Sequence, residues 1–268
     1  QGFSPLYYAL VLSNSSTAMT LIDISTSHAL DEALQKPVKQ GQSLLHHVMV
    51  CHSQDVIDKI LKKSNPYLLN AMLVTMESHG VSPFHEAMKS FRFSSIAETV
   101  VDSVRHSALM KILITQDRDG MTPIHYAVSH QNQDLAQELI EIIGHSELNK
   151  ILTMQNKDSE TLMHRAILNS PGMARLIIQK ANESILFDAL VRQNELGHSP
   201  LYYAYIRPSN KLIIPLITIL KRQARNHLVL AIKQAGDIDL NLLEDLIILL
   251  KDKQASPDDI VKAIDGAM

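Results

Sequence analysis

Apolar residues recur at helical spacing in short segments along most of the chain. In DLAQELIEII (134–143), Leu135, Leu139, Ile140 and Ile143 fall on one helical face. A shorter apolar segment precedes each such segment and begins with Ser or Thr, often followed by Pro. An N-cap hydroxyl accepts a hydrogen bond from a free backbone N–H, and Pro fits the first helical position because no bond is lost there. The pattern therefore predicts an all-α protein built from pairs of helices.

The start of each helix pair is a phrase that occurs six times. The phrases read GFSPLYYA, GQSLLHHV, GVSPFHEA, GMTPIHYA, SETLMHRA and GHSPLYYA. They begin near residues 2, 41, 80, 120, 159 and 197, at Gly2, Gly41, Gly80, Gly120, Ser159 and Gly197. Successive starts are 38 to 40 residues apart. This spacing predicts about six structural repeats in near-constant register.

A third apolar segment follows the second helix of each repeat. Its copies are HALDEALQK (28–36), PYLLNAMLVT (66–75), SALMKILIT (107–115), SELNKILTM (146–154) and SILFDALVR (184–192). Four of them follow Ser or Asn-Pro cap signals, so we expect an extra short helix in each repeat. Each repeat has an apolar stripe that it cannot cover alone, and stacking on the next repeat covers it. We therefore expect residues 1–235 to form a helical solenoid.

The phrase does not occur after about residue 236. Two further helices are predicted at 239–251 and 257–264, and their charged residues suit the polar outer face that a terminal repeat needs. We therefore expect residues 236–268 to form a C-terminal helical cap. No comparable cap precedes the first phrase, and the chain begins without Met. These two features favour a piece of a longer protein.

The phrase resembles the T-P-L-H-x-A signature of ankyrin repeats. The fourth copy matches it best, through Gly120, Thr122, Pro123, Ile124, His125 and Ala127. The resemblance covers roughly residues 1–235 and implies an ankyrin-like solenoid. It also implies that the repeated histidines bond the cap hydroxyl and neighbouring backbone; these are His46, His85, His125 and His164.

The other copies depart from the ankyrin signature. Leu44 and Leu162 replace the proline, and Tyr7 and Tyr202 replace the histidine. Each repeat is also about six residues longer than the usual length of about 33. The extra short helix accounts for this surplus.

Composition narrows the classes of partner. The chain has 268 residues, 46% of them hydrophobic, and a net charge of −3, so it can bury a large core and has no basic excess for nucleic-acid binding. The single cysteine, Cys51, excludes a disulfide scaffold and favours a cytoplasmic location. The longest apolar run, residues 212–220, is much shorter than the roughly 20 residues that span a bilayer. We expect no nucleic-acid partner and no membrane span.

One cluster has residue types that could perform chemistry: His46, His47, Cys51 and His52 in LLHHVMVCH. His47 and Cys51 are four residues apart on a helix, as two metal ligands or a Cys–His nucleophile pair can be. However, the chain has no second ligand pair with metal spacing and no phosphate-binding or metalloprotease motif. A histidine that recurs in every repeat also does not suit a single active site. We therefore expect no catalytic residue, metal, cofactor or small-molecule substrate.

The first helix of each repeat is expected to line the concave side of the solenoid. Groove-facing positions come directly after the His or Tyr of the phrase, one turn further on, and at the tip of the preceding turn. Tyr and Arg are enriched among the residues that dominate protein interfaces. The candidate partner-binding residues are Tyr126, Arg165, His130, Glu86, Tyr203, Ser129, Lys89 and Met121.

The leading hypothesis is a non-catalytic module that binds a partner protein through this groove. One alternative is the targeting or substrate-recruiting part of a larger enzyme whose catalytic domain lies outside this chain. Another is that the chain is itself an enzyme, acting through Cys51. The degenerate repeats and the Ile/Leu/Lys/Asn/Gln-rich texture are also similar to ankyrin proteins that intracellular bacteria deliver into host cells. That resemblance implies a host protein as partner and the host cytoplasm as location.

Overall fold

The regular elements of the described residues are helices. The computed structural model describes residues 3–38, 42–51, 53–77, 80–89, 106–129, 133–207, 212–222 and 247–248. Within these ranges, β-pairing is confined to an isolated bridge between Pro37 and Ser43. The predicted all-α class is confirmed. The chain divides into two compact units, residues 1–135 and residues 136–268, here called unit 1 and unit 2.

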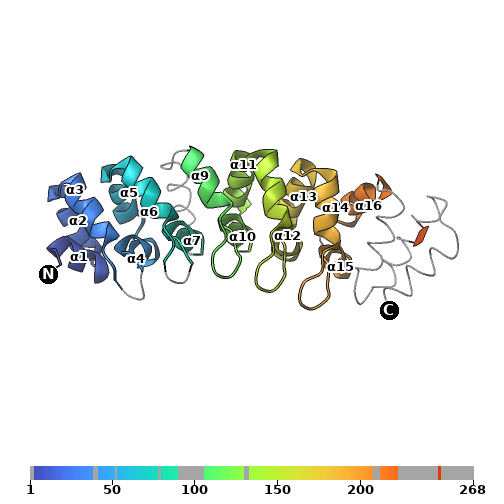
Figure 1. Cartoon of the computed structure of the whole chain (residues 1–268), viewed down its shortest axis with the longest axis horizontal. Coiled ribbons are helices and arrows are strands. Elements are labelled where there is room, and N and C mark those ends of the chain that lie inside the picture. The colour runs from blue at the N-terminus through green and yellow to red at the C-terminus, as the bar shows by residue number, and fades with distance from the viewer. Residues whose placement is uncertain are drawn as a thin grey trace. The chain divides into compact units, whose positions relative to one another are not determined.

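Unit 1 contains the first four copies of the phrase and the helices that they begin. Its first helices are α1 (Pro5–Val11), α4 (Leu44–Cys51), α7 (Pro83–Lys89) and α10 (Pro123–Ser129). Second and extra helices follow as α2 (Ser15–Ile24), α3 (Ser27–Gln35), α5 (Gln54–Lys63), α6 (Pro66–Val74) and α9 (His106–Leu113). Each first helix packs on the next, and the extra helices pack in the same order (Figure 1). Stacking within unit 1 therefore follows the order of the chain.

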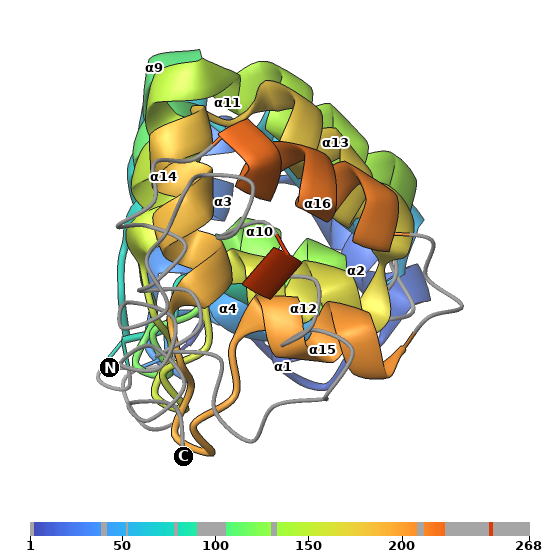
Figure 2. The same cartoon turned by 90° about the vertical axis from the view of Figure 1, so that its right-hand side faces the viewer.

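Unit 2 repeats the same arrangement. Its helices after α11 are α12 (Leu162–Asn169), α13 (Pro171–Lys180), α14 (Glu183–Val191), α15 (Pro200–Ile206) and α16 (Ile213–Arg222). The first helices α12 and α15 pack side by side, with α13 and α16 above them and α14 to one side (Figure 2). This order of first, second and extra helix matches unit 1.

One element combines two predicted helices. α11 (Gln133–Thr153) covers both the second and the extra helix of the repeat that starts at Gly120, and it begins at the end of unit 1. Its regular backbone breaks at Gly144, where φ is 73° and ψ is 174°. Glycine adopts this conformation without steric cost because it has no Cβ. The break therefore separates the two helices that the sequence predicts at 134–143 and 146–154.

The helix starts confirm the capping chemistry of the phrase. The Ser4 hydroxyl oxygen accepts a hydrogen bond from the backbone N–H of Tyr7 at 3.2 Å, and that of Ser199 accepts one from Tyr202 at 3.2 Å. Thr161 forms a capping box with His164. In α3, α6 and α14, the side chains of Thr26, Asn65 and Asn182 cap the extra helices in the same way. Local hydrogen-bonding groups therefore fix where these helices begin.

Part of the core of each unit lies between stacked first helices. Each phrase contributes an apolar residue and, three positions later, a small one, and every member of these pairs is buried. The pairs are Leu6 and Ala9, Leu45 and Val48, Phe84 and Ala87, Ile124 and Ala127, Met163 and Ala166, and Leu201 and Ala204. Burying one large apolar side chain contributes about 1.5–3 kcal/mol. Stacking therefore stabilises the repeats more than the propensity of helices as short as these.

Some expectations fall on residues outside the described ranges. The second helix predicted at 95–104 is one of these, and the C-terminal cap at 236–268 is another, apart from residues 247–248, which are helical. The boundary between 1–235 and 236–268 stays a prediction. The predicted extra helices are confirmed as α3, α6, α9, the second part of α11, and α14.

Candidate functional site

A tight turn precedes the first helix of the later repeats. In the fourth repeat the backbone N–H of Asp117 donates to the carbonyl oxygen of Met121 at 2.9 Å, and that of Gly120 donates to Asp117 at 2.9 Å. The same pair of bonds closes the turns that start at Asn156 and Asn194. Gly120 has a φ of 73°, and Ser159 reaches 59° at the equivalent position. The turn thus keeps its conformation where the sequence replaces glycine.

The repeated histidines join each helix start to the following repeat. In unit 1, His46 Nδ1 accepts the backbone N–H of Ser43 at 3.2 Å, so Nε2 carries the proton and donates to the Val81 carbonyl oxygen at 3.0 Å. In unit 2, His164 Nδ1 accepts from Thr161 N at 3.0 Å, and Nε2 donates to the His198 carbonyl oxygen at 3.0 Å. This is the role that the resemblance implied.

Burial keeps these histidines neutral. Burial lowers the pKa of His46 and of His85, although hydrogen bonds to backbone carbonyls oppose the change. For His164, burial lowers the pKa to about 4. Both ring nitrogens of His164 are occupied by structural bonds. The rings therefore have a structural role in holding repeats together.

In unit 1, three of the candidate residues contact Asp117, which the sequence did not single out as a site residue. These are Tyr126, Lys89 and Met121. The Tyr126 hydroxyl donates to Asp117 Oδ2 at 2.6 Å. Lys89 Nζ lies 3.5 Å from the same oxygen, 3.9 Å from Glu86 Oε1 and 5.0 Å from the centre of the Tyr126 ring. Asp117 Oδ1 accepts the backbone N–H groups of Asp119 at 2.9 Å and Met121 at 3.0 Å. Asp117 thus links the turn to α7 and α10.

Two candidates in unit 1 expose little surface. We expected Tyr126 and Met121 to face the groove, but they are only 9% and 6% exposed. Tyr126 is held by Asp117, and burial together with that hydrogen bond raises the pKa of its hydroxyl. Ser129 is half-buried and donates to the His125 carbonyl oxygen at 2.7 Å. The candidate His130 lies outside the described residues.

In unit 2 the two candidates also contact the turns. Arg165 Nε lies 2.6 Å from Glu160 Oε2, and its terminal nitrogen lies 3.7 Å from Asp158. The Tyr203 hydroxyl accepts a hydrogen bond from Asn194 Nδ2 at 3.2 Å. Both side chains are half-buried. Tyr126, Arg165 and Tyr203, each directly after the His or Tyr of its phrase, are therefore tied to the turn that precedes their helix.

The side chains with the most exposed apolar surface on the first helices lie at the start of unit 1. Tyr8, Leu12 at the end of α1, and Val50 and Cys51 on α4 are all exposed. His47 Nε2 lies 3.0 Å from the Val11 carbonyl oxygen, and its Nδ1 lies 3.7 Å from Cys51 Sγ. The exposed or half-buried side chains of α1, α4 and α7 form what we call the first-helix face of unit 1: Tyr8, Leu12, Val50, Cys51, Glu86 and Lys89.

A sequence signal for the Asp117 cluster exists. Glu77, Asp117, Asn156 and Asn194 each stand three residues before the positive-φ residue of their turn. A carboxylate or amide at a fixed offset before Gly is typical of a side chain that bonds the backbone of its own turn. The repeat alignment therefore contained this position, although the charge partners of Asp117 come from other elements.

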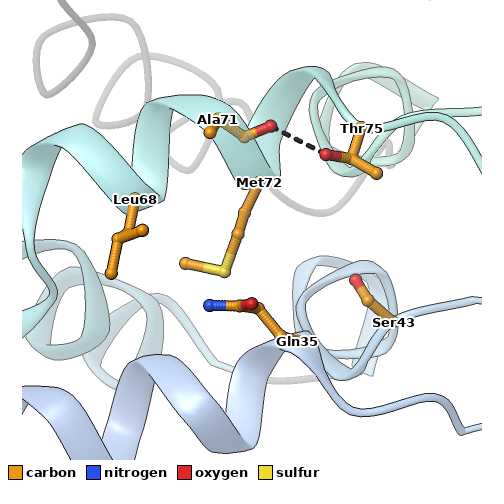
Figure 3. Close-up of a pocket in the computed structure, with 6 residues that line it drawn as sticks. All are labelled: Gln35, Ser43, Leu68, Ala71, Met72 and Thr75. Carbon is orange, nitrogen blue, oxygen red and sulfur yellow. Dashed lines mark hydrogen bonds between the residues drawn. The ribbon is translucent and has the colours of Figure 1, made fainter.

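A pocket of about 280 Å³ lies away from this face, between α3 and α6. Figure 3 shows the Met72 thioether directed toward Gln35, with Leu68 beside them. The Thr75 hydroxyl is not free to bind a ligand, because it donates to the Ala71 carbonyl oxygen at 2.8 Å. The pocket is therefore mainly apolar and offers few polar groups to fix a ligand.

The described ranges contain neither a metal-binding cluster nor a membrane-spanning helix. Across those residues, no group of three or more His, Cys, Asp or Glu side chains is arranged to hold a metal ion. Among the helices of the same residues, none is both long and apolar enough to cross a membrane. His52, from the predicted His–Cys cluster, is outside them.

Comparison with known proteins gives a family for one segment and a fold for the chain. The sequence model of the ankyrin repeat family matches residues 119–150. No curated protein matches the sequence at a significant level.

Three solved structures share the fold. One is the ankyrin repeat domain of Bcl-3, a member of the IkappaB protein family, at 20% identity over 94% of this chain and 99% of that domain, with a TM-score of 0.55. Another is a chain in the complex of a predatory endopeptidase from Bdellovibrio bacteriovorus with an immunity protein (16% identity, 83% and 100% covered, TM-score 0.53). A third is an ankyrin repeat domain from Acinetobacter baumannii AYE (15% identity, 80% and 97% covered, TM-score 0.52). Residues 119–150 therefore match the ankyrin repeat family, and the described repeats of the chain share the helical fold of ankyrin repeat domains.

Proposed function

We propose that this chain is a non-catalytic module that binds a partner protein through the exposed side chains of its first helices. The observation that carries the proposal is the surface at the start of unit 1, where Tyr8, Leu12 and Val50 are exposed. Contiguous apolar side chains left in solvent are characteristic of interaction sites. In unit 2, Arg165 and Tyr203 add the residue types that dominate interfaces.

Two comparisons support this proposal. Ankyrin repeat domains are typically interaction modules, and the fold is shared with the ankyrin repeat domain of Bcl-3. One structure of the same fold comes from a complex of an endopeptidase with an immunity protein. By analogy, this chain would present its first helices to another protein. If the resemblance to delivered bacterial ankyrin proteins holds, that protein belongs to the host.

The use of the histidines supports a non-catalytic role. General acid–base catalysis needs a titratable group that reaches a substrate. His46 and His164 are buried, and both nitrogens of each ring bond the protein itself. Cys51 is exposed and lies beside the half-buried His47, with 3.7 Å between Sγ and Nδ1. Alkylation of Cys51 tests the enzyme alternative, because loss of a measurable activity would contradict the non-catalytic proposal.

The test is capture of partner proteins by the immobilised chain and by two matched variants. Leu12→Asp changes the first-helix face of unit 1, whereas Ile24→Asp changes the end of α2; both residues are 74% exposed. A partner that uses the proposed face should be retained by the wild-type chain and by Ile24→Asp, and lost with Leu12→Asp. Equal retention by all three proteins would contradict the use of this face. Thermal unfolding of each variant checks that both remain folded.

A further inference from the structure

The first-helix face of unit 1 changes from apolar to acidic along the stack. Tyr8, Leu12 and Val50 form its apolar end on α1 and α4. Glu86 and Lys89 on α7 begin its charged end, with Asp117 buried beside them. Because α1 packs on α4 and α4 packs on α7, the helices that carry the two ends are successive neighbours in the stack (Figure 1).

The charged end holds three carboxylates and one ammonium group. Lys89 Nζ lies nearer to Asp117 Oδ2, at 3.5 Å, than to Glu86 Oε1, at 3.9 Å. The Asp117 side chain is fully buried, so its charge depends on Lys89 and on the Tyr126 hydroxyl. Glu77 adds a third carboxylate, and its buried Oε2 accepts no hydrogen bond from the described part of the chain. Negative charge therefore exceeds positive charge in this group.

The surroundings of Glu86 are unfavourable for its own negative charge. Burial raises the pKa of Glu86; Lys89 lowers it, and the charges of Glu77 and Asp117 raise it again. The net change is upward, so the free chain holds the ionised form of Glu86 at a cost. A second cation placed beside Glu86 would remove that cost. The same excess of negative charge opposes phosphate groups, as in nucleic acids and anionic lipids.

The distance between the two ends limits the partner segment. Packed helices have axes about 8–10 Å apart, and Val50 lies three helical positions further along α4 than the position equivalent to Glu86 on α7, an offset of about 4.5 Å. Together these give a separation of about 10 Å between the two positions. An extended chain advances about 3.3 Å per residue. An apolar side chain on α4 and a cation at Glu86 are therefore about three residues apart in an extended segment.

From these observations we infer that the first-helix face of unit 1 binds an extended segment of a partner protein that combines an apolar side chain with Lys or Arg about three residues away. The apolar side chain packs against Leu12 and Val50, and the cation pairs with Glu86. This inference rests on the proposed partner-binding function and adds the chemistry of the partner.

The test begins with a phage-displayed library of random dodecapeptides, selected on the full chain. Selected peptides should share an apolar residue and a Lys or Arg at the stated spacing. One selected peptide is then synthesised with a fluorescent label, and its Kd is measured for the wild-type chain and for variants. Val50→Asp should weaken binding about tenfold, because it removes apolar surface and places a charge there.

Glu86→Gln gives the most informative result. It removes the cation partner, so the Kd should rise about tenfold. Because the ionised carboxylate is disfavoured in the free chain, the same variant should unfold at the same or a higher temperature than the wild type. A residue that only supports the fold would not weaken binding while leaving stability unchanged or improved.

Glu147→Gln is the matched control, because Glu147 also pairs with a lysine three residues later, Lys150, at 3.3 Å. It should leave the Kd unchanged. The inference is overturned if the selected peptides lack a basic residue, or if Glu86→Gln and Glu147→Gln bind the peptide equally well. Either result, together with a captured partner that Leu12→Asp loses, leaves the proposed function standing. A library without specific peptides and a capture without any partner would overturn both.

Discussion

Two turns of the same backbone conformation hold different side chains, and the difference decides how the neighbouring helix is used. In unit 1, Asp117 Oδ1 accepts two backbone N–H groups of its turn, while Oδ2 takes the Tyr126 hydroxyl at 2.6 Å and faces Lys89. In unit 2, Asn156 Oδ1 accepts the equivalent two N–H groups, at 3.0 and 2.8 Å. The amide has no charge to balance, and its Nδ2 faces Glu160 at 3.4 Å.

The burial of the residue directly after the repeated histidine depends on which side chain the turn holds. A buried carboxylate needs donors, so Tyr126 turns inward and is buried. Asn156 is a neutral amide and needs no buried donor to balance a charge. The acids of this turn, Glu160 and Asp158, lie nearer the surface, so Arg165 stays half-exposed beside them. Tyr126 therefore contributes mainly to the fold, whereas the Arg165 side chain stays partly exposed. One charge in a turn thus changes the role of a residue nine positions later.

The largest effect that separates the two turns should come from removing the turn residue itself. Asp117→Ala removes the acceptor of two turn N–H groups, the nearer ion-pair partner of Lys89 and the acceptor of the Tyr126 hydroxyl, so it should lower the free energy of unfolding by about 3–5 kcal/mol. Asn156→Ala removes the same two acceptors but no charge, and should cost about 1–3 kcal/mol. Urea unfolding of both variants measures the difference. Equal losses would show that the charge of Asp117 adds nothing to stability.

Acid should act on what the two units share, the buried histidines. His164 has a pKa of about 4 when folded, against an ordinary value of 6.5. Between these values the unfolded chain binds a proton that the folded chain does not, so stability falls as pH falls from 6.5 toward 4. His164 alone should contribute a loss of about 3 kcal/mol across this window. His46 and His85 add losses of the same sign, since burial lowers the pKa of both.

The check is unfolding of the wild type, His164→Gln and His28→Gln at neutral and acid pH. His164→Gln should unfold more easily at neutral pH and lose less on acidification. His28 is exposed on α3, and its variant should follow the wild type. Identical pH profiles for all three proteins would contradict the role given to His164.

The smallest effect compares the two residues after the histidine. Tyr126→Phe leaves a buried, charged acceptor without its hydroxyl donor and should cost about 1.5–3 kcal/mol. Arg165→Gln breaks a partly exposed ion pair and should cost less than about 1 kcal/mol. Melting temperatures of the two variants rank them, and the reverse order would mean that Arg165 has the structural role.

Local chemistry explains what the sequence predicted well. Ser4, Thr161 and Ser199 cap helices where the phrase places them, because capping depends on groups three residues apart. The extra helices follow from the same signals and from helical spacing. The histidine bonds were implied by the resemblance, and the register of the repeats supplies their acceptors.

The sequence pattern did not predict which of the equivalent side chains point inward and which stay at the surface. Tyr126 and Arg165 occupy equivalent positions in the repeat, yet one is buried and the other half-exposed. The choice depends on Asp117 and Asn156, which come from a turn rather than from the helix being analysed. The repeat pattern also contained no signal that Lys89 on α7 reaches Asp117 in the turn before α10. Such contacts depend on how repeats stack, which periodicity alone does not determine.

The histidine rings give the stack within each unit a direction. His46 in unit 1 and His164 in unit 2 each bond their own helix start on one side and a carbonyl of the following repeat on the other, at Val81 and His198 respectively. When a repeat unfolds, the histidine Nε2–H of the repeat before it loses its carbonyl acceptor. Unfolding that starts at the later repeat of a unit therefore weakens the repeat before it, and so spreads toward the N-terminal end of that unit.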